Sequence, residues 1–150
     1  MTSKKTVEEF FAQPALAVVG VSRTGKKFGN SAYKTLKEKG YNVYQIHPKS
    51  KSIDGDECYP DFKSVPAKVG AAIMVIKPIH ALQVLQEAAD AGIKYVWLQQ
   101  GAESKEAIDF CIKNGMHVVH GECILMFTEP VKSIHRFHRW IWTIAGKMPK

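Results

Sequence analysis

The amino-acid sequence predicts an α/β fold, built as a three-layer, doubly wound parallel sheet of about five strands with an extra C-terminal helix. Short apolar runs alternate along the chain with segments in which apolar residues recur at helical spacing. Nearly every position of these runs is apolar, which is typical of parallel strands covered on both faces. This alternation predicts right-handed crossovers between neighbouring parallel strands. The five runs span residues 15–21, 43–46, 71–76, 95–98 and 116–119.

The first two helices flank the first strand. Thr6 and Glu9 have the spacing of a capping box, so we expect a short helix to begin there and to end before Pro14. After the first strand, Asn30 or Ser31 can cap a second helix, because a side-chain oxygen at this position accepts a backbone N–H.

Three further helices are expected downstream. Helical spacing of apolar residues predicts one helix over residues 79–89 and another over residues 104–114. A last helix is expected over residues 129–145, and it either packs on the sheet of this domain or forms a homodimer contact. These elements together predict a Rossmann-like domain. Glycine, which often ends a helix, follows three of the predicted helices, at Gly40, Gly92 and Gly115.

Length and composition predict one domain over residues 1–150, with a core over about residues 15–123. The sequence lacks the charge pattern of a signal peptide and an apolar run long enough to cross a membrane. We therefore expect a cytoplasmic protein with no membrane partner. An odd number of cysteines without a CxxC pair favours reduced thiols over disulfides, and these cysteines are Cys58, Cys111 and Cys123.

The chain is basic, with 21 Lys and Arg against 14 Asp and Glu and a formal net charge of +7. Such a charge favours anionic partners, whether nucleic acid, a membrane surface or a phosphorylated small molecule. The basic residues are scattered, and neither an aromatic-rich RNA-binding strand nor zinc-finger spacing accompanies them. The pattern therefore argues against nucleic acid, and many of the lysines are expected to be solvated.

Polar and glycine-bearing segments follow four of the predicted strands. In an open α/β sheet the ligand lies beyond the carboxyl ends of the strands. The first segment runs through Gly20, Ser22 and Arg23 into a helix, where unpaired N–H groups attract anions. This segment is predicted to hold phosphate. The four segments span residues 20–30, 47–49, 76–78 and 99–102.

The pattern differs from that of an NAD site. Ser22 stands where the second glycine of the G-x-G-x-x-G fingerprint belongs. An NAD site also needs an acidic residue at the end of the second strand, and this strand ends in His47, Pro48 and Lys49. Lys49, with His47 as a second candidate, would pair with a phosphate on the ribose, which points to coenzyme A (CoA) or to NADP. The alternative is that Lys49 is a solvated loop lysine.

These motifs resemble those of the small CoA-binding domain proteins. Those proteins are single-domain relatives of the CoA-binding domain in succinyl-CoA synthetase α subunits and ADP-forming acyl-CoA synthetases. The resemblance runs from about Ala15 to Cys123 and rests on the order and spacing of several short motifs. The motifs are Gly20-Val-Ser22, Gly29-Asn-Ser31, Gly40-Tyr-Asn-Val-Tyr44, Pro48-Lys49, Ile53-x-Gly55, Cys58-Tyr59-Pro60, the apolar run 71–76, Val96-Trp97-Leu98-Gln99-x-Gly101 and Gly115-x-x-Val118-Val119.

The resemblance implies a ligand, CoA or acyl-CoA, and a set of contacts. The chain departs from the family pattern at His47, where Asn is usual, and in the basic, aromatic segment after Cys123, to which the resemblance assigns no role. The implied contacts are Gly20, Ser22, Arg23, Asn30 and Ser31 around the pyrophosphate, His47, Pro48 and Lys49 at the adenosine end, Ile76, Lys77 and Pro78 as a wall, and Gln99, Gln100 and Gly101 along the pantetheine arm.

The sequence predicts no catalytic residues and no metal site. The related synthetases act through a phosphorylated histidine in a second domain, for which we expect no room in 150 residues. His135 and His138 could share a helix face and bind a metal with His120 or Cys123, but no HExxH or CxxC motif accompanies them. For Cys123 a buried thiol is favoured over a reactive one.

The sequence therefore predicts a CoA- or acyl-CoA-binding protein that acts as a non-catalytic module, a carrier or a sensor. The alternative is a small NADP-dependent oxidoreductase or another dinucleotide-binding enzyme. That alternative needs a proton donor beside a nicotinamide and a substrate pocket, and the sequence indicates neither. A basic nucleic-acid binder is a third hypothesis, which rests only on net charge and the expected C-terminal helix.

Overall fold

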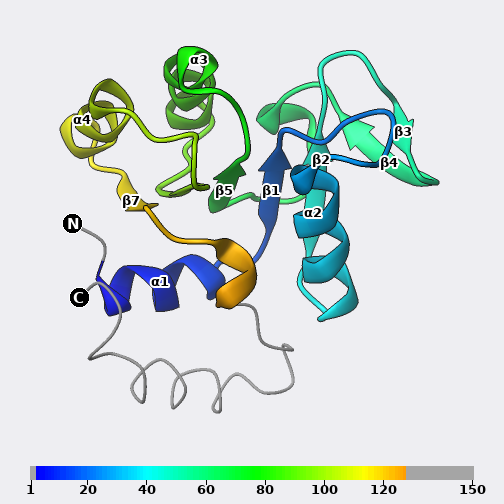
Figure 1. The fold of residues 1–150 in the computed structure, drawn as a ribbon, viewed down its shortest axis with the longest axis horizontal. Coiled ribbons are helices and arrows are strands. Elements are labelled where there is room, and N and C mark those ends of the chain that lie inside the picture. The colour runs from blue at the N-terminus through cyan, green and yellow to red at the C-terminus, as the bar shows by residue number, and fades with distance from the viewer. Residues whose placement is uncertain (1–2, 128–150) are drawn as a thin grey trace.

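The computed structural model describes residues 3–127, which form a sheet covered by helices on both faces (Figure 1). The strand order is β3-β4-β2-β1-β5-β6-β7, and every pairing is parallel except the antiparallel β3–β4 pair. The α/β class and the parallel sheet are thus confirmed. The strands are β1 (Leu16–Val19), β2 (Val43–Ile46), β3 (Ser52–Ile53), β4 (Asp56–Tyr59), β5 (Ala71–Met74), β6 (Tyr95–Leu98) and β7 (His117–His120).

The sheet has seven strands within the described residues, so the expected count of about five was wrong. The additional strands β3 and β4 form a hairpin whose two-residue turn is Asp54-Gly55. Both turn residues have positive φ, 52° and 82°, as the type I′ turn of a tight hairpin requires. β4 then pairs with β2 and extends the edge of the sheet. The hairpin lacks a long apolar run, so the sequence indicated a polar loop here.

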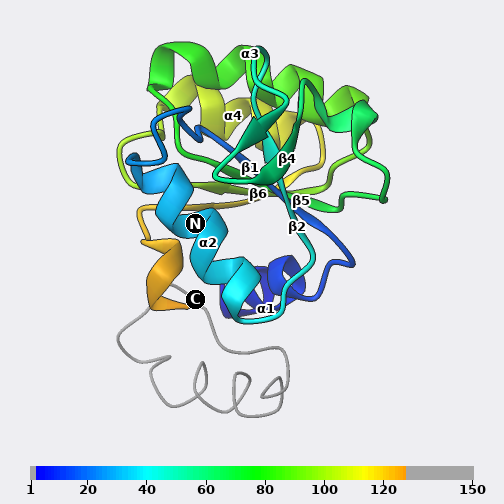
Figure 2. The same cartoon turned by 90° about the vertical axis from the view of Figure 1, so that its right-hand side faces the viewer.

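Two helices cover each face of the sheet, as Figures 1 and 2 show from perpendicular directions. α1 and α2 lie on one face, and α3 and α4 lie on the other. Short 3-10 turns, η1 (Phe62–Ser64) and η2 (Ile124–Met126), complete the described chain. The three predicted layers are therefore present. The helices are α1 (Lys4–Phe11), α2 (Phe28–Glu38), α3 (Pro78–Asp90) and α4 (Lys105–Lys113).

Two helix starts differ from the expectation. α1 begins three residues earlier than expected, because the Ser3 side chain accepts the Thr6 N–H and is its N-cap. α2 begins at Phe28 after the N-cap Lys27, so neither Asn30 nor Ser31 is the N-cap. Asn30 is the third residue of the helix, and its side chain accepts the Lys27 N–H. The later helices match the expectation more closely. In α4, for example, the Ser104 side chain accepts the Ala107 N–H at 3.1 Å.

Alternate residues of each strand face opposite layers, so the core has two halves. On the α3 and α4 face, small and aliphatic residues such as Ala72 and Leu85 are buried. On the α1 and α2 face, the fully buried Trp97 lies among Phe10, Phe11 and Phe127, with ring centroids 5.4–5.7 Å apart. The Trp97 indole N–H donates to the Glu122 carbonyl at 3.1 Å. Trp97 therefore joins β6, α1 and the segment after β7.

Several expectations concern single residues or segments. Cys58, Cys111 and Cys123 are free thiols, and burial raises the pKa of Cys111 to about 11. Within residues 3–127 no helix has the length and apolar character needed to cross a membrane. The helix and homodimer contact expected over residues 129–145 lie outside the described residues.

The position of Trp97 yields a prediction about stability. Trp97→Ala should lower the free energy of unfolding by roughly 3–5 kcal/mol, because it leaves a large cavity among three aromatic rings. Trp97→Phe keeps a ring and loses the bond to the Glu122 carbonyl, so the loss should be smaller, about 1–3 kcal/mol. Urea denaturation of the two variants measures this order, and equal losses would contradict it.

Candidate functional site

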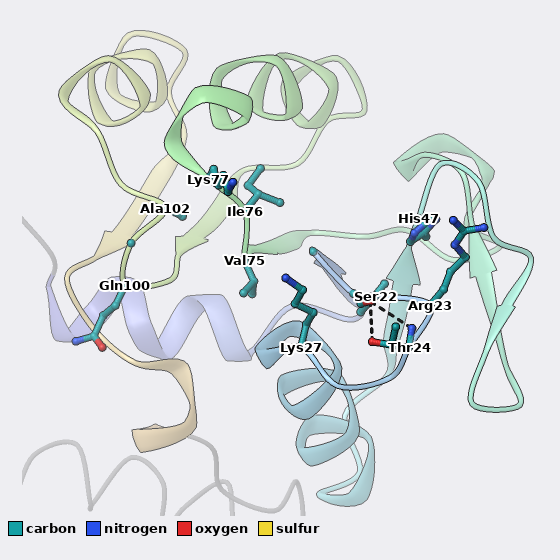
Figure 3. A pocket seen from close by; sticks show the side chains of 13 residues that line it. Ser22, Arg23, Thr24, Lys27, His47, Val75, Ile76, Lys77, Gln100 and Ala102 are labelled. Carbon is teal, nitrogen blue, oxygen red and sulfur yellow. Dashed lines mark hydrogen bonds between the residues drawn. The ribbon is translucent and has the colours of Figure 1, made fainter.

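A cleft of about 620 Å³ lies at the carboxyl ends of the parallel strands (Figure 3). Its volume falls within the range of small-molecule sites, roughly 300–1,000 Å³. The chain runs from β1 to its neighbour β2 on one side and later to β5 on the other, so strand order reverses between β1 and β5. Ligands of open α/β sheets bind at such a reversal. The lining residues come from four loops and are residues 20–24, Lys27, His47, residues 75–77 and residues 100–102.

Two glycines allow the backbone segments around the cleft to approach closely. Gly20 has φ +111°, and a Cβ there would collide with the Val75 carbonyl oxygen after β5. A Cβ on Gly29, in the first turn of α2, would likewise collide with the Gly20 carbonyl oxygen. A side chain at either position would push β1, β5 and α2 apart. These contacts place the N-terminus of α2 directly over the end of β1.

Asn30 holds both ends of the loop between β1 and α2. Its Oδ1 accepts the Ser22 N–H at 2.9 Å and the Lys27 N–H at 3.2 Å. Its Nδ2 donates to the Ser22 carbonyl at 3.0 Å. The residue is only 7% exposed, so this amide is shielded from competing water. Asn30 therefore fixes the shape of the loop from beneath.

The loop is also bonded within itself. The hydroxyls of Ser22 and Thr24 lie 3.0 Å apart, and each accepts a backbone N–H, from Thr24 and Lys26 respectively. The Gly25 N–H donates to the Ser22 carbonyl at 3.0 Å. A hydroxyl group can both donate and accept a hydrogen bond. A phosphate oxygen could therefore accept the loop N–H groups in place of the two hydroxyls, which would then donate to the phosphate. The loop is therefore already folded, and its N–H groups could bond to a phosphate instead of to the hydroxyls.

The electrostatics of the cleft favour an anion. Arg23, Lys27 and Lys77 line it, and no carboxylate does among the described lining residues. The N-termini of α2 and α3 both point at it, since Lys27 and Lys77 are their N-caps. Helix N-termini carry partial positive charge and unpaired N–H groups. The cleft can therefore bind a ligand with several negative charges.

His47 follows β2 and presents a neutral imidazole. Its Nδ1 accepts the backbone N–H groups of Lys49 and Ser50, both at 3.1 Å. Burial lowers the pKa of His47, and the charges of Arg23 and Lys49 lower it further. A neutral ring that accepts at Nδ1 carries its proton on Nε2. His47 thus keeps one N–H donor beside a guanidinium.

The structure brings eight of the fourteen predicted site residues to the cleft. They come from all four loops, as the sequence indicated. The match reflects the parallel register, which brings the strand ends to one edge of the sheet. The eight residues are Gly20, Ser22, Arg23, His47, Ile76, Lys77, Gln100 and Gly101.

The other six predicted residues do not line the cleft. Asn30 and Ser31 line a second cavity, of about 800 Å³, between α2 and the β3–β4 hairpin. Pro48 and Lys49 are exposed in the loop after β2, and Pro78 is the first residue of α3.

Two glutamines after β6 bond to the segment that follows β7. Gln99 is buried, and its Oε1 accepts the Ile124 N–H at 3.0 Å. Gln100 lines the cleft, but its amide turns away and donates to the Gly121 carbonyl at 3.5 Å. At Gly101 the N–H donates to the Glu103 carboxylate at 3.1 Å. The contacts of Gln99 and Gln100 with a pantetheine arm stay a prediction.

The list of predicted contact residues omitted five lining residues, four of which lie within the predicted segments 20–30 and 99–102. The loop positions of Lys27 and Thr24 offered a signal, because both belong to the basic, hydroxyl-bearing turn before α2. For the apolar residues, no feature of the sequence distinguished those that line the cleft from those that are buried in the core. The omitted residues are Val21, Thr24, Lys27, Val75 and Ala102.

The metal cluster considered in the sequence analysis, His135 and His138 with His120 or Cys123, lies partly outside the described residues. Within residues 3–127 no group of three or more His, Cys, Asp or Glu side chains is placed to hold a metal ion. His135 and His138 lie outside this range.

Comparisons with known proteins show the family to which the chain is related. The sequence model of the CoA binding domain matches residues 15–129. The chain is 30% identical over 129 residues to the alpha subunit of ADP-forming acetate–CoA ligase II of Pyrococcus furiosus, covering 79% of this chain and 28% of that protein. It is 25% identical over 143 residues to ADP-forming acetate–CoA ligase I of Archaeoglobus fulgidus, covering 89% of this chain and 21% of that protein. The chain thus spans less than a third of these relatives.

Two solved structures add to the comparison. A conserved hypothetical protein of Pyrococcus furiosus is 38% identical, with a TM-score of 0.71 over 76% of this chain and 98% of its own. Dinucleotide-forming acetyl-coenzyme A synthetase 1 of Candidatus Korarchaeum cryptofilum is 28% identical, with a TM-score of 0.66 over 78% of this chain and 27% of its own. With a family match over most of its length, the chain belongs to the CoA-binding domain family.

Proposed function

We propose that this protein binds CoA or an acyl-CoA and acts as a binding module, a carrier or a sensor. One observation carries the proposal. A single cleft combines a preformed loop, two helix N-termini and three cationic side chains, without a carboxylate among its described lining residues. CoA carries a pyrophosphate and a ribose phosphate, which match such a cleft. Membership of the CoA-binding domain family supports the same ligand.

The lining residues suggest how CoA would lie. The pyrophosphate would meet the loop between Ser22 and Lys27, where the N-terminus of α2 adds its partial positive charge. The adenosine would extend toward His47, and Ile76 with Lys77 would form a wall beside it. The pantetheine arm would pass along residues 100–102 on the opposite side of the cleft. Acyl groups would then point away from the phosphates.

The ligase reaction is not part of this proposal. The chain matches 28% and 21% of two ADP-forming acetate–CoA ligases, which are much longer proteins. This chain shares the binding domain with them, and ligand binding alone explains the features of its cleft.

We further propose one domain over residues 1–150, a cytoplasmic location and a homodimer formed through residues 129–145. Native mass spectrometry would detect the dimer.

Ligand-dependent stability tests the choice of CoA. Millimolar CoA should raise the thermal midpoint, because a ligand that binds the folded state stabilises it by about 2.7 kcal/mol at one hundred times Kd. NAD should have little effect, since a cleft with cations at the ribose end favours an additional phosphate. Differential scanning fluorimetry measures both shifts. Stabilisation by NADPH without stabilisation by CoA would contradict the proposal and favour an oxidoreductase.

Asn30 provides a second test, because its hydrogen bonds fix the loop between β1 and α2, which we call the phosphate loop. Asn30→Ala should lower the free energy of unfolding by roughly 1–3 kcal/mol and weaken CoA binding, since it leaves two loop N–H groups without their acceptor. The matched control is Ser31→Ala at the exposed neighbouring position, which should change the stability little. Urea denaturation and titration calorimetry measure both effects. Equal behaviour of the two variants would contradict the assigned role of Asn30.

A further inference from the structure

We infer that Arg23 and His47, rather than Lys49, recognise the phosphate on the ribose of CoA. The inference rests on the proposed function and makes it more specific. It also replaces the expectation that Lys49 has this role. Two groups lining the cleft would then distinguish CoA from its analogue without the ribose phosphate, dephospho-CoA.

The topology places the ribose at the end of β2. In doubly wound folds the residue that follows the second strand of the unit contacts the ribose hydroxyls, and a nearby arginine accommodates a ribose phosphate. β2 ends at Ile46, and His47 comes next in the chain. Among the described residues of this loop, His47 is the one that lines the cleft. The ribose end of the ligand therefore meets His47.

The loop backbone fixes the orientation of the His47 ring. Both N–H groups that follow Pro48 donate to Nδ1, so the ring cannot turn without losing two hydrogen bonds. The remaining ring donor is the Nε2–H group. A neutral imidazole held in this way donates one hydrogen bond to a phosphate oxygen. His47 thus supplies direction, and a neighbouring group has to supply the positive charge.

Arg23 supplies that charge. Its side chain extends toward His47 in Figure 3, and its charge lowers the pKa of the imidazole. Arg23 is exposed and makes no ion pair with any described residue, so its guanidinium is available to a ligand. A guanidinium can bind two phosphate oxygens at once with parallel hydrogen bonds. Arg23 and His47 together can therefore hold one phosphate.

Two further cations line the cleft away from this pair. Lys27 extends toward Val75 and Ile76 in Figure 3, away from Arg23, and Lys77 lies at the start of α3. Their positions suit the pyrophosphate, which would lie over the loop and the helix N-termini. The cations are thus divided between two sites, one at Arg23 and one at Lys27 and Lys77. This division matches CoA, which carries a ribose phosphate and a separate pyrophosphate.

Lys49 contributes through its backbone. Its N–H is one of the two groups that orient His47, and its exposed side chain does not belong to the cleft lining. Replacement of the side chain keeps that N–H. Lys49→Ala should therefore preserve the preference for CoA over dephospho-CoA.

Titration calorimetry with CoA and dephospho-CoA tests the inference. The wild type should bind CoA more tightly by roughly ten- to hundredfold, the expected value of charge-assisted hydrogen bonds to one phosphate. Arg23→Gln should remove most of this preference by weakening CoA binding while leaving dephospho-CoA binding within about twofold. Arg23→Lys keeps the charge without the bidentate geometry and should retain part of the preference. His47→Ala should also reduce it.

The outcomes separate this inference from the proposed function. Loss of the preference in Lys49→Ala, with Arg23→Gln unchanged, would overturn the inference and restore the role to Lys49. Equal weakening of both ligands by Arg23→Gln would also overturn it, because Arg23 would then bind the pyrophosphate. If the wild type binds neither ligand, the proposed function fails, and the inference fails with it.

Discussion

The hydrogen bonds of the Asn30 amide connect the fold to the cleft. This side chain bonds to Ser22, near the start of the loop between β1 and α2, and to Lys27, the N-cap of α2. The contact is geometrically feasible because Gly20 and Gly29 let β1 and α2 approach to backbone contact. Without these two glycines the amide could not reach both ends of the loop. The shape of the phosphate loop, the direction of α2 and the position of Arg23 all depend on this arrangement.

The same arrangement determines which groups the cleft offers to a ligand. Its donors are backbone N–H groups, hydroxyls and cations, which hold charge in place. His47 is kept neutral and fixed by two backbone donors, so its Nδ1 is not free to take a proton from a substrate. Cys111 is buried, and its raised pKa keeps it a thiol. These features of the described residues support the proposed binding of a phosphorylated ligand.

Much of the fold could be predicted because buried parallel strands leave a clear apolar signal. The strands β1, β2, β5, β6 and β7 and the glycine after α2, Gly40, follow from local sequence patterns alone. The β3–β4 hairpin could not be recognised from apolar periodicity, since its short strands expose polar residues. The Asp54-Gly55 turn was the available signal, because this pair favours the positive φ values of a type I′ turn.

The candidate site was predictable at the level of loops and less so at the level of side chains. Parallel strands bring their carboxyl ends to one edge, so residues from all four predicted loops line one cleft. Whether a side chain faces the cleft or the protein depends on tertiary contacts. Asn30 supports the loop, and Gln99 bonds to Ile124 beneath the surface. Lys27 reaches the cleft because α2 begins earlier than its capping pattern suggested.

The most direct test of CoA binding in this cleft is a titration of the ¹⁵N-labelled protein with CoA, followed by backbone amide chemical shifts in NMR spectra. If CoA binds as described, the largest shifts should come from residues 20–27, His47, residues 75–77 and residues 100–102, which surround the cleft. The amides of α1, none of whose residues lines the cleft, serve as an internal reference. Absence of shifts, or shifts confined to residues outside the cleft, would contradict the account.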